Sequence, residues 1–151
     1  MIASRLLFRI TLAVGRLHDL GDTPRGRRRV AEVTGGRFEG DRLRGTVVPT
    51  PAGDWLLQRH DDVTELDVRL LLRTDDGALI DMRYGGLRHG PADVMARLAA
   101  GEVVDPSLYY FRTTPRFETA APAYLWLNKV VSIGIGSREP TGPVYEIHEV
   151  L

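Results

Sequence analysis

Residues 65–84, ELDVRLLLRTDDGALIDMRY, form two alternating runs on either side of a short polar segment. A period of two places successive side chains on opposite faces of a β-strand. The segment Thr74-Asp-Asp-Gly77 between the runs is typical of a chain reversal. The stretch therefore predicts an antiparallel hairpin with one apolar face, made of Leu66, Val68, Leu70 and Leu72 before the turn and Ile80, Met82 and Tyr84 after it.

The same period continues outside the hairpin. Further strands are predicted over residues 4–16, 29–38, 43–48, 55–58, 109–114, 129–137 and 144–150. Gly35-Gly36 indicates a bulge or bend, residues 21–27 a loop, and Pro115 the end of regular pairing. One helix is predicted to start at Pro91 and stop at Gly101, and residues 121–128 are expected to form a bend or a single helical turn.

About nine strands and one helix favour an antiparallel sandwich or a closed barrel, and closure is attractive because it removes the sheet edges. We expect one all-β domain over residues 1–151. Its fold class is an antiparallel closed β-barrel of the lipocalin or calycin type with one short helix.

The composition excludes several kinds of function. Twenty basic and twenty acidic residues cancel, so no global field attracts nucleic acid or a membrane surface. The absence of cysteine excludes disulfides, thiolate catalysis and iron–sulfur clusters. The four histidines lack metal-binding spacing, and GIGIGS lacks the third glycine of a dinucleotide loop. Without a signal-peptide core or a membrane-spanning apolar run, a cytoplasmic protein with no cofactor and no metal is expected.

Charged residues occupy the second face of the hairpin, namely Glu65, Asp67, Arg69 and Arg83. If the apolar face forms the core, this row faces water. If the barrel holds a ligand, the row faces inward, and Asp67 and Arg69 pair with Arg83 across the hairpin. An aspartate beside arginines stays ionised and binds a polar ligand or acts as a weak general base. A second charged group, Arg25 and Arg27–Arg29, is either a solvated strand end or a site for an anion.

Six of the eleven aromatic residues lie in one stretch, YYFRTTPRFETAAPAYLWLN, residues 109–128. These rings either fill the core or form a stacking wall for a planar or apolar molecule. On the second interpretation Arg112 and Glu118 are polar handles, and Asn128 adds an amide.

Asp54 precedes Trp55 after the glycine of TPAGDW. An aspartate in a turn usually caps the local backbone, but at a pocket mouth it is also a general acid or base. The candidate catalytic residues are therefore Asp54, Asp67 and Glu118. The candidate substrate-binding residues are Trp55, Arg69, Arg83, Tyr110, Arg112, Trp126 and Asn128.

Three segments, GALIDMRYGGLRHGP, YYFRTTPRFETAAPAYLWLN and VSIGIGSREPTGPVYEIHEV, closely resemble the small bacterial proteins of domain-of-unknown-function family 3237 (DUF3237). The resemblance covers about residues 31–150 and leaves out the strand at 4–16. It implies a single β-barrel domain and little about activity. Ala121 departs from the glycine expected there, which makes the bend stiffer. The family-like positions are Asp54, Trp55, Asp67, Arg69, Arg83, Tyr110, Phe111, Arg112, Phe117, Glu118, Trp126 and Asn128.

Three functions fit these features. The first is a barrel that binds a small hydrophobic or aromatic molecule and catalyses a cofactor-independent cyclisation, isomerisation or proton transfer. It predicts an inward cavity of about a few hundred Å3 lined by Asp67, Arg69, Arg112 and Trp126. The second is a carrier with the same pocket; a strong pKa shift of Asp54, Asp67 or Glu118 favours the enzyme over it. The third is an assembly protein, and in each case a homo-oligomer, dimeric or larger, is expected.

Overall fold

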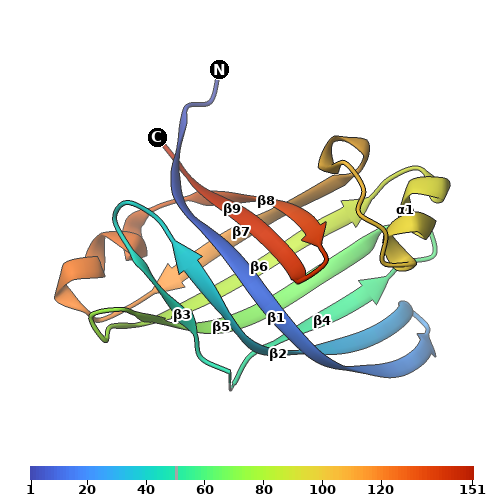
Figure 1. The fold of residues 1–151 in the computed structure, drawn as a ribbon, viewed down its shortest axis with the longest axis horizontal. Helices are drawn as coiled ribbons and strands as arrows, with labels where there is room; N and C mark the ends of the chain where they lie inside the picture. The colour runs from blue at the N-terminus through green and yellow to red at the C-terminus, as the bar shows by residue number, and fades with distance from the viewer. Residues whose placement is uncertain (50) are drawn as a thin grey trace.

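Hydrogen bonds join nine antiparallel strands into a barrel-like ring in the computed structural model, which describes residues 1–49 and 51–151 (Figure 1). The strands are β1 (Ser4–Thr23), β2 (Gly26–Glu39), β3 (Arg44–Val47), β4 (Gly53–Gln58), β5 (Thr64–Thr74), β6 (Leu79–His89), β7 (Tyr110–Glu118), β8 (Ser132–Glu139) and β9 (Gly142–Val150). The helical segments are α1 (Ala92–Ala99) and two 3-10 turns, η1 (Pro106–Leu108) and η2 (Pro122–Lys129). The expected all-β antiparallel fold is confirmed.

The ring follows the order β1-β9-β8-β7-β6-β5-β3-β2, and β1 pairs with β2 to complete it. Strands β3 and β4 share one place, because both pair with β2 on one side and with β5 on the other. Nine strands therefore make a ring of eight positions. Thr50, the first residue of the quoted TPAGDW, lies outside the described residues.

Two predicted boundaries are wrong. Residues 21–27 are not a loop, because β1 continues to Thr23 and Gly21 pairs with Arg28 across a long β1–β2 hairpin. Pro115 does not end pairing either, since β7 continues to Glu118 and Pro115 lies opposite Tyr84. The Pro115 carbonyl accepts a hydrogen bond from Ser132 Oγ on the β8 side, where the regular ladder is short, so the missing proline N–H breaks no ladder bond.

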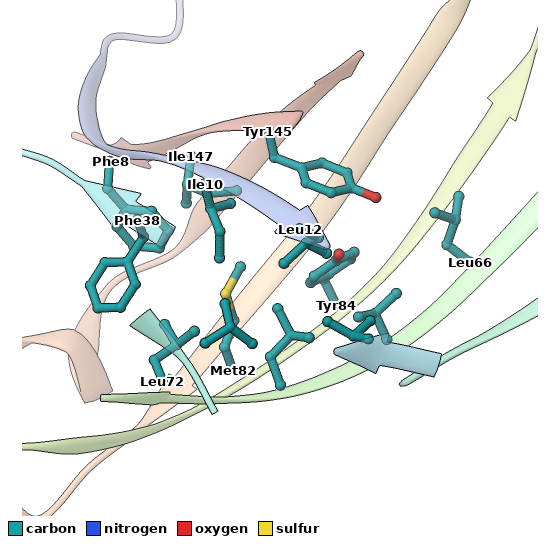
Figure 2. Packing of buried hydrophobic residues seen from close by; sticks show 14 of the residues in the cluster. Phe8, Ile10, Leu12, Phe38, Leu66, Leu72, Met82, Tyr84, Tyr145 and Ile147 are labelled. Atoms are coloured by element: carbon teal, nitrogen blue, oxygen red, sulfur yellow. The ribbon is translucent and has the colours of Figure 1, made fainter. Parts of the chain in front are cut away.

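The apolar face of the β5–β6 hairpin points into the ring, and its charged row faces water. Val68, Leu70, Leu72 and Met82 are almost fully buried. They pack against rings and aliphatic side chains from β1, β2 and β9, as Figure 2 shows for Phe8, Phe38 and Ile147. The middle of the ring is thus filled with side chains, which contradicts the inward orientation of the charged row.

On strand β8 the small residues, instead of the large apolar ones, face inward. They include Gly134 and Gly136, whereas Ile133 and Ile135 are exposed. A Cβ atom on Gly136 would lie 2.6 Å from the ring of Phe111, and one on Gly134 would lie 2.1 Å from Thr113 Oγ1. The larger side chains of β7 occupy the space that β8 side chains would otherwise take.

The two ends of the ring differ. In Figure 1, α1 and the tip of the β1–β2 hairpin lie at one end, and η2 lies at the other. Leu127 of η2 is buried, and the Tyr124 hydroxyl donates to the Asp76 carboxylate at 3.0 Å, which fixes η2 over its end. No helix within residues 1–49 and 51–151 is long and apolar enough to cross a bilayer.

Gly136→Ala tests the close contact between β8 and β7. The added methyl group must displace the fully buried ring of Phe111, so we expect a loss of about 1–3 kcal/mol in the free energy of unfolding. The matched control Ile135→Val changes the outward neighbour and is expected to stay within about 0.5 kcal/mol of the parent. Urea unfolding measures both, and equal midpoints for the two variants would contradict this packing.

Candidate functional site

On five strands the row of inward-facing residues ends in polar side chains, and these ends meet at one end of the ring. They surround a cavity of about 180 Å3 that also contains Val14, Leu17, Leu56 and Phe111, and we call it the mouth pocket. The polar residues in it or directly beneath it are Arg29, Asp54, Tyr84, Arg88, Arg138 and Tyr145. They come from β2, β4, β6, β8 and β9, so only closure of the ring brings them together.

These side chains face inward because successive side chains of a strand alternate between its two faces. On β6, Arg88 lies an even number of positions after the buried Met82 and Tyr84. On β2, Arg29 precedes the buried Ala31 and Val33 in the same way. The face that carries core residues in the middle of the ring therefore carries arginine at its mouth.

Asp54 is the only carboxylate lining the mouth pocket, within the part of the chain that the structure describes. It lies opposite Ala31 of β2 and Val68 of β5, and its Oδ1 accepts a long hydrogen bond of 3.4 Å from the Asp67 N–H. Burial raises the pKa of Asp54 from 3.8 to about 7, while that hydrogen bond and the charge of Arg88 act in the opposite direction. Both protonation states are therefore populated near neutrality, as a general acid or base requires.

Tyr84 and Tyr145 form the floor beside Asp54. Both are fully buried, with ring centroids 5.2 Å apart, and Figure 2 shows them on the side of the core away from Phe8 and Phe38. Burial raises the pKa of each hydroxyl, so both stay neutral. The contact between the two hydroxyls raises the pKa of Tyr84 and lowers that of Tyr145, which makes Tyr84 the donor of the pair, and the Asp54 charge raises both. The nearest partner of the buried Tyr84 hydroxyl is therefore the Tyr145 hydroxyl, although their geometry falls short of a good hydrogen bond.

Three arginines complete the pocket. The guanidinium of Arg88 lies 5.5 Å from the ring centroid of Phe111, and burial lowers the pKa of Arg88. The Nε atoms of Arg29 and Arg88 are buried without a partner in the described chain. Arg138 stands at the rim, where its backbone N–H donates to the Tyr109 hydroxyl at 3.0 Å. The pocket thus combines a titrating carboxylate, neutral hydroxyls and free guanidinium donors.

Two larger hollows, of about 810 and 640 Å3, lie on the outer surface of the ring. In the first, Arg69 is exposed and paired with Asp81 at 3.4 Å, and Arg83 pairs with the same carboxylate at 3.0 Å. These charges are already neutralised and solvated. We therefore place the candidate site in the smaller mouth pocket, where the charges are partly buried and lack partners.

The predicted site residues are divided between the inside and the outside of the ring. Of the three catalytic candidates, Asp54 faces the mouth pocket, whereas Asp67 and Glu118 are exposed on the outer face. Trp55 also points outward, because consecutive residues of β4 face opposite sides. Arg69 and Arg83 lie opposite each other on the outer surface and share Asp81 instead of pairing with Asp67.

The aromatic stretch is divided in the same way. Phe111 and Phe117 belong to the core, while Tyr110 is exposed and stacks on His89 with centroids 5.0 Å apart. Arg112 is exposed beside Tyr110, and its guanidinium donates to the neighbouring Phe111 carbonyl. The predicted cavity lined by Asp67, Arg69, Arg112 and Trp126 is therefore wrong, because the first three of these side chains face the solvent.

Trp126 and Asn128 lie on η2, at the end of the ring opposite α1 (Figure 1). The guanidinium of Arg42 covers the Trp126 ring at 3.5 Å from its centroid. The Asn128 amide bonds both the N–H and the carbonyl of Thr119, at 3.0 and 2.9 Å. Both residues hold η2 against the ring, and neither lines the mouth pocket.

Sequence reasoning missed Tyr84, Arg88, Arg138 and Tyr145 as site residues. Extending each alternating stripe past its last aliphatic residue would have identified Arg88. The basic group at residues 25–29 is also divided: Arg29 faces the pocket, whereas Arg27 pairs with Asp19 and Arg28 bonds the Trp55 carbonyl. No group of three potential metal ligands occurs in the residues described.

Comparison with known proteins agrees with this fold. The family model described as "Protein of unknown function (DUF3237)" matches residues 3–150, including β1, which the sequence resemblance had left out. The crystal structure of RPA1785, a conserved protein of unknown function from Rhodopseudomonas palustris, is similar over 100% of this chain and 99% of its own, with 34% identity and a TM-score of 0.95. A β-barrel-like protein from Acinetobacter baumannii covers 100% and 97%, with 36% identity and a TM-score of 0.87. An enzyme from Penicillium herquei shares the fold at 19% identity and a TM-score of 0.75, over 99% and 95% of the two chains.

Asp54→Asn tests the burial of the Asp54 carboxylate. Near pH 4 the folded chain keeps Asp54 protonated, so the variant should match the parent in stability. Between pH 4 and about 7 the unfolded chain loses this proton first, because its pKa is the ordinary 3.8, and the parent therefore becomes progressively less stable. At pH 8 the variant should be more stable by on the order of 2–4 kcal/mol.

Urea unfolding at pH 4.5 and pH 8 measures this difference. Glu118→Gln, on the exposed outer face of β7, is the control and should show little change between the two values. A stability difference between Asp54→Asn and the parent that does not depend on pH would show that Asp54 is not desolvated in the fold.

Proposed function

Because this chain belongs to the DUF3237 family, which is described as of unknown function, we propose its activity from the mouth pocket. We propose a cofactor-independent enzyme that moves protons on a small hydrophobic or aromatic molecule, in an isomerisation or a cyclisation. In this proposal the ring acts as a closed barrel of the lipocalin or calycin type whose filled interior supports a site at one mouth.

The main support for this proposal is the raised pKa of Asp54. A carboxyl group whose pKa is about 7 is half ionised at neutral pH, so it accepts and returns a proton with little driving force lost in either direction. A carrier needs no such group, and a desolvated carboxyl is costly to the fold, which favours catalysis over passive binding.

The proton transfer is balanced without a cofactor. The Asp54 carboxylate removes a proton from a carbon next to a carbonyl group, and the electron pair moves to the carbonyl oxygen. The neutral Tyr145 hydroxyl and the Arg88 guanidinium, which both line the pocket, are the donors available to stabilise that oxyanion. Protonated Asp54 then returns the proton at a different carbon, which isomerises the molecule.

Cyclisation uses the same groups in another order. Asp54 takes the proton of a substrate hydroxyl group while the oxygen of that hydroxyl adds to an unsaturated carbon of the substrate. The resulting carbanion or enolate then accepts the proton back from Asp54. Neither path oxidises or reduces the substrate. The apolar walls, formed by Val14, Leu17 and Leu56, suit the hydrophobic part of a substrate and keep water from the reacting carbon.

Proton exchange in deuterium oxide tests this function without knowledge of the natural substrate. A panel of small aromatic ketones is incubated with the protein, and NMR follows deuterium uptake next to the carbonyl. The parent should accelerate exchange on at least one panel member, with half-maximal rate near pH 7. Asp54→Asn should lower that rate by about 100-fold or more, since it removes the general base.

Glu118→Gln again serves as the control, because it removes an exposed carboxylate outside the pocket. Equal rates for the parent and Asp54→Asn would refute a catalytic role for Asp54. Binding of panel members without any exchange would favour the carrier.

A further inference from the structure

We propose that the mouth pocket recognises a carboxylate, and that the molecule it takes is a small organic acid with an apolar body. This inference deepens the proposed function, on which it rests, by naming the substrate class of the same pocket. It is supported by the charge balance of the pocket, by its unpartnered donors and by its apolar walls.

The charge balance of the pocket is strongly positive. Arg29, Arg88 and Arg138 converge from β2, β6 and β8, and the one carboxylate among the described lining residues is Asp54. None of the three arginines forms an ion pair with any carboxylate that the structure describes. Arginines on the outer surface, such as Arg27 and Arg37, are paired instead. The pocket therefore has two to three positive charges that an anion would neutralise.

The donors of these arginines are also unsatisfied. Nε of Arg29 and Nε of Arg88 are buried without a hydrogen-bond partner in the described chain. Buried donors without partners are costly, and a planar carboxylate matches the fork of a guanidinium. A bound carboxylate would supply the missing acceptor, whereas a neutral ligand would leave the charges unpaired.

The walls around these donors are apolar. Val14 and Leu17, on the part of β1 that extends past the ring, line the pocket yet are 44% and 49% exposed. Leu56 and Phe111 face them from β4 and β7. A ligand with a hydrophobic body would cover the exposed Val14 and Leu17 while its anionic end reaches the arginines.

The arginines also line a second hollow. A cavity of about 600 Å3 beside α1 shares Arg29 and Arg88 with the mouth pocket and includes Met95 and Ala99 of the helix. The two guanidiniums therefore stand between the two hollows. A carboxylate held there leaves room for a body on either side, so acids with one ring or more fit the site.

The affinity for an acid should depend on the protonation of Asp54. An ionised Asp54 repels a bound carboxylate, whereas a protonated one does not. The charged and titratable groups that face Asp54 from the surrounding strands are Arg29, Tyr84, Arg88, Arg138, Tyr145 and, through β5, Asp67. Burial keeps both tyrosines neutral and the arginines remain protonated, so near neutrality Asp54 is the group lining the pocket whose charge changes. Acid binding should thus tighten as the pH falls through about 7.

Benzoate and benzamide form a matched pair of probes, because they share shape and differ in charge. Titrations followed by NMR should show benzoate binding at least about tenfold more tightly than benzamide at pH 6. Arg88→Gln should abolish this preference, and Arg138→Gln at the rim should weaken it. The control Arg116→Gln removes an exposed arginine on the outward face of β7 and should leave the preference unchanged.

Equal affinity for benzoate and benzamide would overturn the inference, and so would an equal loss of benzoate binding in Arg88→Gln and Arg116→Gln. Asp54→Asn should bind benzoate with the same affinity at pH 6 and pH 8, and a pH dependence that survives this substitution would also contradict it. These measurements need no turnover. Failure of the acid preference therefore refutes the substrate class, whereas failure of Asp54-dependent deuterium exchange refutes the proposed function.

Discussion

The pairing of β1 with β2 is the constraint on which the rest of the structure depends, because it completes the ring. Once the ring is complete, every strand has one face inside and one outside, and the inside has a fixed volume. Large residues on β1, β2, β5, β6 and β7 fill that volume, so β8 is left with glycine and serine on its inner face. The same closure brings Arg29, Asp54 and Arg88 to one mouth, although they lie far apart in the sequence.

The sequence predicted the elements that depend on local pattern. The period of two and the turn at residues 74–77 were sufficient to define the β5–β6 hairpin, and Pro91 and Gly101 closely bracket α1. The orientation of faces was harder to predict, because it depends on what neighbouring strands contribute. On β8 the isoleucines face outward, because Phe111 of β7 already occupies the space inside. Pro115 looked like a strand end, yet it lies where the β7–β8 ladder is short.

The candidate site was less predictable than the fold for the same reason. Asp54 stood out because of its neighbours in the sequence, but its partners come from strands whose register along the ring only the closed structure defines. The rows of charges and rings that drew attention in the sequence are mainly solvated pairs, such as Arg69 with Asp81, or core residues, such as Phe117. A conspicuous cluster in a β-strand sequence is often the outward face, whereas isolated polar residues that continue an apolar stripe mark the inside.

Binding and acid–base chemistry are coupled in this pocket through Arg88. The pKa of Asp54 reflects two opposing effects: loss of water raises it, and the positive charge of Arg88 lowers it. An anion that pairs with Arg88 cancels part of the lowering effect and also displaces water, so both changes raise the pKa of Asp54 further. A carboxylate with a higher pKa is a stronger base, provided that it is ionised when the substrate arrives. Neutralisation of the arginines by the ligand therefore makes Asp54 a stronger base when it is ionised, but it also raises the pH at which Asp54 is ionised, so binding of the acid is favoured at lower pH and proton removal at higher pH.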